Sequence, residues 1–159
     1  MISVVFLDVD GVLNNSETTD LTPEHFTGLD DILLQRLSTI ISETKSVVVL
    51  TSTWKDEWNK DKSKCIGDGK YLEEKLLQYG VTIFDKVDDS KTGSFHRAAS
   101  INNYLESHLD IEHYLILDDF EFDFASYPEL IKHWIHTDES VGLTEDDIQI
   151  GINILRKER

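Results

Sequence analysis

The chain has 159 residues, 40% of them hydrophobic, and a formal net charge of −16, which predicts a single folded domain over residues 1–159 and argues against disorder. The excess of 31 acidic over 15 basic residues excludes general, sequence-independent binding to nucleic acids, because such a surface repels polyanions. No apolar run approaches the roughly 18–20 residues of a membrane span and no basic leader precedes the first apolar segment, so we expect a cytoplasmic protein without a membrane partner.

The first half of the chain alternates between strand and helix patterns. Residues 3–8 are apolar and rich in β-branched side chains, which predicts a buried strand. Apolar residues then recur at helical spacing over 29–43, which indicates an amphipathic helix. A second buried strand is expected at 46–51, and the polar insert 53–69 separates it from a helix over 70–80.

The same alternation continues in the second half. A third strand is expected at 81–84, a helix at 94–108 and a fourth strand at 113–117. A weaker fifth strand at 133–136 precedes a helix that begins after a cap at Thr144. Strands alternating with helices predict a three-layer α/β sandwich around a largely parallel, five-stranded sheet.

Reactive side chains gather where the predicted strands end. In open α/β sheets ligands bind outside the carboxyl ends of the strands, so these side chains are expected at one edge. They are Asp8, Asp10 and Gly11 after the first strand, Thr51 and Ser52 after the second, Asp118 and Asp119 after the fourth, and a basic residue, Lys91 or Arg97, before the fourth.

The two carboxylates after the first strand suit phosphoryl transfer. Asp8 can attack a phosphorus atom and form an aspartyl phosphate, which water later hydrolyses. Asp10 can protonate the leaving oxygen and then deprotonate the water. Val9 points to the opposite face of an extended strand, so Asp8 and Asp10 lie on the same side. Gly11 lets the chain turn away without steric cost.

This chemistry calls for a divalent cation, because a carboxylate that approaches a phosphate is an anion meeting an anion. Magnesium prefers one or two carboxylates together with waters and substrate oxygens. The expected metal ligands are Asp8, Asp10, Asp118 and Asp119, with the choice between the last two left open. Hydroxyl and cationic groups would hold the phosphoryl oxygens. The expected phosphate-binding residues are Gly11, Thr51, Ser52 and Arg97.

Four ordered motifs resemble those of the haloacid dehalogenase superfamily. They are LDVDGVL at 7–13, VVVLT at 47–51, the basic residue Lys91 or Arg97, and LILDD at 115–119. The resemblance implies a Rossmann-like sheet with a β-hairpin flap, here 13–28, and a first aspartate that acts as nucleophile with the second as general acid and base. It also implies Mg²⁺ as cofactor.

A narrower likeness is carried by DVDGVLN, LTSTW, YLILDD and VGLTEDD. Together they resemble the capless phosphatase domains of RNA-repair proteins and the phosphatase half of polynucleotide kinase-phosphatase. Within this likeness Arg97 is preferred over Lys91, because its distance to the fourth strand and its place at the start of a helix match the subgroup. Lys55 stands where members of the subgroup often carry an arginine.

Other residues receive structural interpretations. The histidines show no HxH or HxxxH spacing, so no zinc site is expected. Trp54 and Trp58 are interpreted as packing residues rather than a platform for base stacking. Asp123 is a candidate partner behind the metal site. The lysines between Lys55 and Lys70 are interpreted as a solvated loop, with a landing strip for an anionic substrate as the alternative.

We therefore expect a magnesium-dependent phosphomonoester hydrolase. No segment is long enough to form a large cap, and an open site suits a bulky phosphorylated substrate such as an oligonucleotide end or a phosphoprotein, while a nucleotide stays possible if 53–69 folds over as a lid. The alternative is an inactive relative that binds a phosphorylated ligand or serves as an assembly module. Phosphotransfer to an acceptor other than water is a third interpretation.

Overall fold

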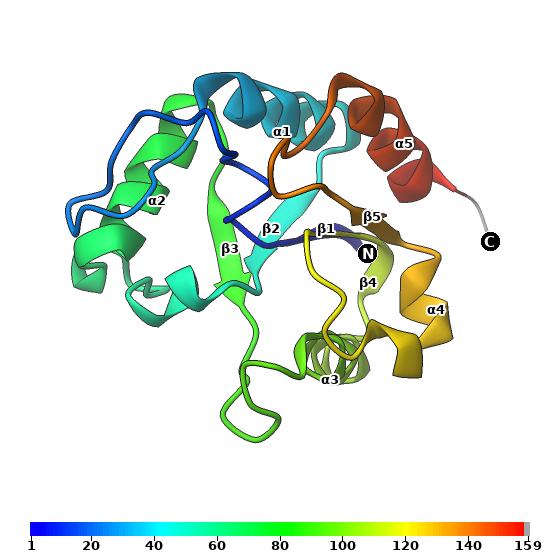
Figure 1. Cartoon of the computed structure of the whole chain (residues 1–159). Helices are drawn as coiled ribbons and strands as arrows, with labels where there is room; N and C mark the ends of the chain where they lie inside the picture. The colour runs from blue at the N-terminus through cyan, green and yellow to red at the C-terminus, as the bar shows by residue number, and fades with distance from the viewer. Residues whose placement is uncertain (158–159) are drawn as a thin grey trace.

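A computed structural model describes residues 1–157. Its centre is a sheet of five strands, all parallel, in the order β3-β2-β1-β4-β5 (Figure 1). The predicted α/β architecture is therefore confirmed, and no strand in the described part of the chain departs from parallel pairing. The strands are β1 Ile2–Leu7, β2 Val47–Leu50, β3 Ile83–Lys86, β4 Ile111–Asp118 and β5 Trp134–His136.

Helices cover both faces of this sheet. On one face lie α1 (Asp31–Thr44), α2 (Gly67–Gln78) and α5 (Glu145–Arg156), and on the other lie α3 (Arg97–Ser107) and the short α4 (Pro128–Ile131) (Figure 1). Among residues 1–157 no helix is both long and apolar enough to cross a membrane. Short 3-10 helices lie in the connections, η1 at Thr53–Asp56, η2 at Lys62–Lys64 and η3 at Phe124–Ser126.

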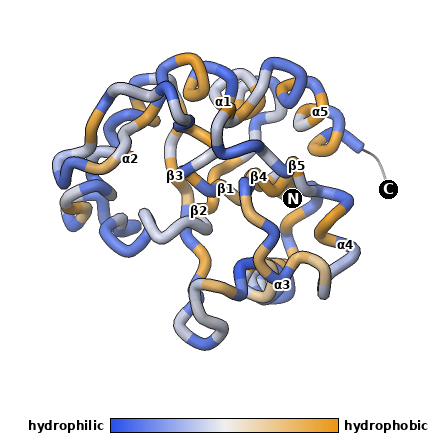
Figure 2. Tube along the Cα trace, viewed as in Figure 1, coloured by the Kyte–Doolittle hydropathy of each residue, from blue (hydrophilic) through white to orange (hydrophobic). Residues whose placement is uncertain are grey.

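The core follows from the alternation of side chains along the strands. Val5 and Leu7 of β1 pack into the cluster that contains α1, α2 and α5, whereas Val4 and Phe6 pack into the cluster that contains α3 and α4. All four are fully buried, as expected of a parallel strand covered on both faces. Figure 2 shows hydrophobic residues concentrated in the central strands.

Several boundaries differ from the expected ones. The third strand begins at Ile83 rather than at 81, because the Val81 amide donates to the Leu76 carbonyl and belongs to the turn that ends α2. Gly80 has φ +74 in that turn, the left-handed conformation typical of helix ends. The helix α2 begins at Gly67, inside the stretch expected to be a polar insert. The helix α4 was not predicted, and its four residues are too few to give a periodic pattern.

The flap expected at 13–28 is less regular than a β-hairpin. Its antiparallel pairing is one isolated bridge between Leu21 and Thr27. Side chains hold the segment instead: Asn14 donates to the Gly28 carbonyl, at 3.0 Å. The amide of Leu29 donates to the Tyr71 hydroxyl of α2, at 3.1 Å.

Candidate active site

The ends of β1, β2 and β4 meet because the ladder of backbone hydrogen bonds continues one residue beyond the strands. The Asp8 amide donates to the Leu117 carbonyl at 2.9 Å, and the Thr51 amide donates to the Leu7 carbonyl at 3.0 Å. Leu7 pairs with both Leu50 and Leu117. The register of the sheet therefore places Asp8, Thr51 and Asp118 side by side at the carboxyl ends of these strands, where the sequence predicted them.

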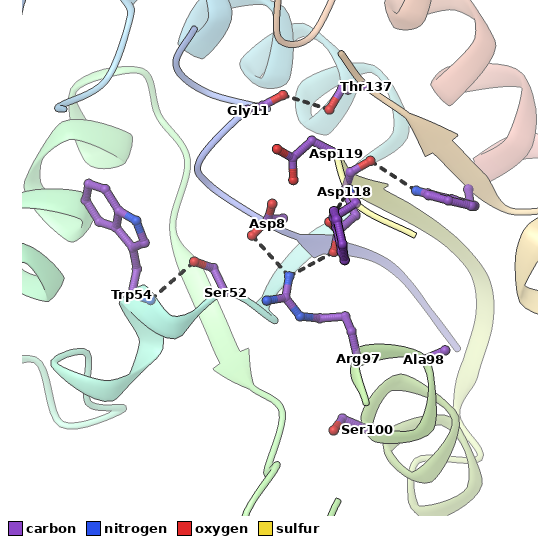
Figure 3. A network of polar contacts seen from close by, with 12 residues as sticks. Asp8, Gly11, Ser52, Trp54, Arg97, Ala98, Ser100, Asp118, Asp119 and Thr137 are labelled. Carbon is purple, nitrogen blue, oxygen red and sulfur yellow. Dashed lines mark hydrogen bonds and ion pairs between the residues drawn. The ribbon is translucent and has the colours of Figure 1, made fainter. Parts of the chain in front are cut away.

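Arg97 joins two of these carboxylates. Its Nη1 lies 3.1 Å from Asp8 Oδ1 and 2.8 Å from Asp118 Oδ2 (Figure 3). All three side chains are buried, with Asp118 fully so. The guanidinium also stacks 4.4 Å from the centre of the Phe122 ring. Two buried carboxylates thus share one cation, which leaves this cluster with an excess of negative charge.

Both carboxyl groups have raised pKa values. Burial, reinforced by the charge of Asp118, raises the pKa of Asp8 well above its usual range, although Arg97 opposes this shift. Burial also raises the pKa of Asp118 to about 6, again against the effect of Arg97. Ionised oxygens that are this poorly compensated favour a further positive charge beside them.

A divalent cation fits this position. Carboxylate oxygens of Asp8, Asp118 and Asp119 lie within 4.8 Å of one another, and such hard oxygen donors are the ligands that Mg²⁺ prefers. Gly11 has φ +77, and a Cβ at that position would clash with the Asp119 carboxylate. Glycine is therefore needed here both for its backbone conformation and for the close approach of Asp119.

The carboxylate of Asp10 is not part of that group, although the sequence placed Asp10 among the metal ligands. Its Oδ1 accepts a hydrogen bond from Asn14 Nδ2 at 2.9 Å, and its Oδ2 accepts one from Trp54 Nε1 at 3.1 Å. Asp10 is exposed, whereas Asp8 is buried. The two aspartates of the first motif therefore have different surroundings.

The hydroxyl of Thr51 is buried and unpaired. Thr51 is 2% exposed, and within residues 1–157 its Oγ1 has no hydrogen-bond partner. A buried hydroxyl without a partner is costly, so this group is available to a ligand oxygen. The hydroxyl of the neighbouring Ser52 accepts a hydrogen bond from the Trp54 amide at 3.2 Å, so Ser52 caps the start of η1 (Figure 3).

The two basic candidates lie in different places. Arg97 is the first residue of α3 and reaches Asp8, whereas Lys91 is exposed in the connection before α3 and lines a separate cavity with Asp85 and Tyr104. The geometry favours Arg97 as the cation of the site.

Asp123 holds the start of α3. Its two carboxylate oxygens accept from the amides of Ala98, at 2.7 Å, and Ala99, at 3.0 Å. The sequence suggested that Asp123 lies behind the metal site, but its carboxylate contacts the helix instead and so places Arg97.

A groove of about 680 Å³ opens beside Asp10 and Asp119. Trp54 and Phe26 contribute aromatic side chains to it, and no lysine or arginine of the described chain is among its lining residues. The Glu57 side chain raises the pKa of Glu24 through a hydrogen bond. Sequence reasoning missed this groove, because its residues come from separate segments and form no motif. Its acidic residues are Asp10, Glu24, Glu57, Asp68, Asp119 and Glu139.

The lysines between Lys55 and Lys70 do not line the groove. Lys55 is buried and its Nζ lies 2.8 Å from Asp89, and Lys62 pairs with Glu73, also at 2.8 Å. These two lysines support the connections around β3.

Comparison with known proteins gives one family. The family model described as "HAD domain in Swiss Army Knife RNA repair proteins" matches residues 4–148. No curated protein and no solved structure gives a significant match. The matched range includes all candidate residues from Asp8 to Asp119.

Proposed function

The chain belongs to the haloacid dehalogenase (HAD) domains of Swiss Army Knife RNA repair proteins, and from this membership we propose that it is a magnesium-dependent phosphomonoester hydrolase with Asp8 as its nucleophile. The observation that carries the proposal is the buried Asp8 carboxylate, held by Arg97 beside Asp118 at the edge of the sheet. The proposed substrate is a terminal phosphate of a nucleic acid, or a nucleotide.

In the first proposed step an oxygen of Asp8 attacks the phosphorus atom. The bond between phosphorus and the leaving oxygen breaks, and Asp10 gives its proton to that oxygen, so that an alcohol departs. In the second step Asp10 takes a proton from a water molecule, whose oxygen attacks the phosphorus. The bond to Asp8 breaks, and inorganic phosphate and the free carboxylate result.

Three other groups would support these steps. Arg97 fixes the orientation of the Asp8 carboxylate through the 3.1 Å contact. The unpaired Thr51 hydroxyl can donate to a phosphoryl oxygen. Asp8, Asp118 and Asp119 would hold Mg²⁺, whose positive charge lowers the repulsion between the nucleophile and the phosphate.

The test is phosphate release, with and without Mg²⁺, from 3′- and 5′-phosphorylated oligonucleotides, mononucleotides, a phosphopeptide and an aryl phosphate. We expect magnesium-dependent release that falls by at least about 10³-fold in Asp8→Asn, because the nucleophile is lost. Glu121→Gln is the matched control, since it removes an exposed carboxylate that is not part of the proposed site. Folded wild-type protein that releases phosphate from none of these substrates would refute the proposal and favour a phospho-ligand binding module.

A further inference from the structure

Both oxygens of the Asp10 carboxylate accept a hydrogen bond from a neighbouring segment. Asn14 Nδ2 reaches Oδ1 at 2.9 Å and Trp54 Nε1 reaches Oδ2 at 3.1 Å. Asp10 is otherwise exposed at the mouth of the acidic groove. An exposed aspartate without such contacts would rotate freely, so the two donors fix the direction in which the carboxyl group points.

Each donor is itself held in place. Asn14 is buried, accepts from the Gly11 amide at 2.9 Å and donates to the Gly28 carbonyl at 3.0 Å. The Trp54 amide donates to Ser52 Oγ, and its ring lies 6.4 Å from the Tyr71 ring, centre to centre. The indole therefore links the segment after β2, which carries Thr51 and Ser52, to the acid after β1.

We propose that Trp54 and Asn14 are positioning residues for Asp10, which they hold where the leaving oxygen of the substrate is protonated. This inference rests on the proposed function, in which Asp10 is the general acid. Proton transfer requires a heavy-atom distance of about 2.6–3.2 Å to the reacting oxygen, so a carboxyl group free to rotate would spend most of its time misplaced. Each carboxylate oxygen has two lone-pair sites, so one can accept the positioning hydrogen bond while the other carries the proton that is transferred.

The contribution of a positioned general acid to the rate depends on how strongly the leaving group requires protonation. An alkoxide is a poor leaving group and needs protonation, whereas 4-nitrophenolate leaves without it. Loss of positioning should therefore slow the first step, which kcat/KM reports, far more for alkyl phosphates and nucleoside 3′-phosphates than for 4-nitrophenyl phosphate. The second step, in which Asp10 acts as base for every substrate, contributes to kcat instead. A purely structural role for Trp54 would slow all of them alike.

The variant Trp54→Phe keeps an aromatic ring and removes the indole N–H. We expect kcat/KM for alkyl and nucleoside phosphates to fall roughly 10-fold or more, part of the 10²–10⁴-fold that general acid catalysis contributes. The kcat/KM for 4-nitrophenyl phosphate should stay within about 2-fold of wild type, because its first step needs no protonation of the leaving group. The matched control is Trp58→Phe, which removes an indole bond to Glu73, at 2.9 Å, that does not touch Asp10.

A second measurement does not depend on turnover. In a ¹⁵N–¹H spectrum, Asp10→Ala should move the Trp54 indole signal and speed its hydrogen exchange, while the Trp58 signal stays in place. Equal losses of kcat/KM across all leaving groups, or none, would overturn the inference even if the wild type is active. If the wild type cleaves no phosphate ester, the proposed function fails, and an unmoved Trp54 signal would then also refute the contact.

Discussion

At the scale of single residues, the site buries two carboxylates beside one positive charge, which is unfavourable for the stability of the fold. Asp8 and Asp118 share the single guanidinium of Arg97, and burial raises the pKa of both carboxyl groups. In the absence of a metal ion, the ionised pair costs the fold free energy. Function and stability are therefore in conflict at Asp8, as is common in active sites.

This conflict predicts how Asp8→Asn affects stability. Because the folded-state pKa of Asp8 is raised, the folded protein holds this proton longer than the unfolded chain as the pH rises. The stability contributed by the protonated group is present at low pH and is lost as the pH rises from about 4 through the raised pKa. In EDTA at pH 7.5, the free energy of unfolding of Asp8→Asn should thus exceed that of the wild type by about 1 kcal/mol or more. This difference corresponds to a Tm that is higher by roughly 2–4 °C.

Calorimetry across pH values checks this prediction. The advantage of Asp8→Asn should shrink as the pH is lowered toward 4, where the wild-type carboxyl group is neutral as well. A variant that is less stable than the wild type at pH 7.5 in EDTA would mean that the hydrogen bond to Arg97 outweighs the desolvation of Asp8.

At the scale of elements, the placement of α3 decides whether a cation reaches the nucleophile. The helix begins at Arg97, and the preceding N-cap residue His96 provides no side-chain hydrogen bond to it. Asp123, which lies beyond β4, accepts from the first free amides instead. The connection after β4 therefore fixes the start of α3, the helix that precedes this strand in the chain.

The variant Asp123→Ala tests this arrangement. Loss of the cap should lower the free energy of unfolding by about 0.5–2 kcal/mol, and kcat should fall because Arg97 loses its fixed position. Glu121→Ala is the matched control, since it removes an exposed carboxylate from the same connection. Urea unfolding and initial rates give both quantities, and equal effects of the two variants would contradict the role of Asp123.

The sequence predicted those parts of this site that local patterns determine. Strand ends, and with them Asp8, Thr51 and Asp118, follow from apolar runs of β-branched residues and from parallel pairing. The contact of Asp123 with α3 and that of Trp54 with Asp10 join residues 25 and 44 positions apart. Such contacts depend on how connections fold over the sheet edge, and no periodicity in the sequence encodes them. The start of β3 was misplaced because helix-ending hydrogen bonds use residues that look like a strand.

At the scale of the whole molecule, the charge is opposite to that of most proteins that bind nucleic acids. The net charge is −16, and the described groove beside the site is lined by acids without a lysine or arginine. A phosphorylated oligonucleotide, the proposed substrate, would therefore approach against a repulsive field. Within the proposed function, this repulsion argues for short substrates or for the ends of longer ones.

This repulsion predicts an unusual salt dependence. Between 0.01 M and 0.15 M NaCl the Debye length falls from about 30 Å to about 8 Å. At saturating Mg²⁺, kcat/KM for a phosphorylated oligonucleotide should therefore rise several-fold, whereas an aryl phosphate with a single phosphate should change less. Initial rates measured over this range of NaCl concentration test the prediction. A kcat/KM for oligonucleotides that falls as the salt concentration rises would indicate attraction through a surface other than the groove.

The order of strands also has a consequence for synthesis. β1 lies at the centre of the sheet, and its Leu7 pairs with Leu117, 110 positions later. At about 5–20 residues per second, a ribosome needs on the order of ten seconds to supply that partner. Until then the apolar strand β1 can pair with β2, but the edge that β4 will occupy stays open. Nascent chains stalled before β4 should therefore bind chaperones and resist compaction, while chains extended past β5 should not.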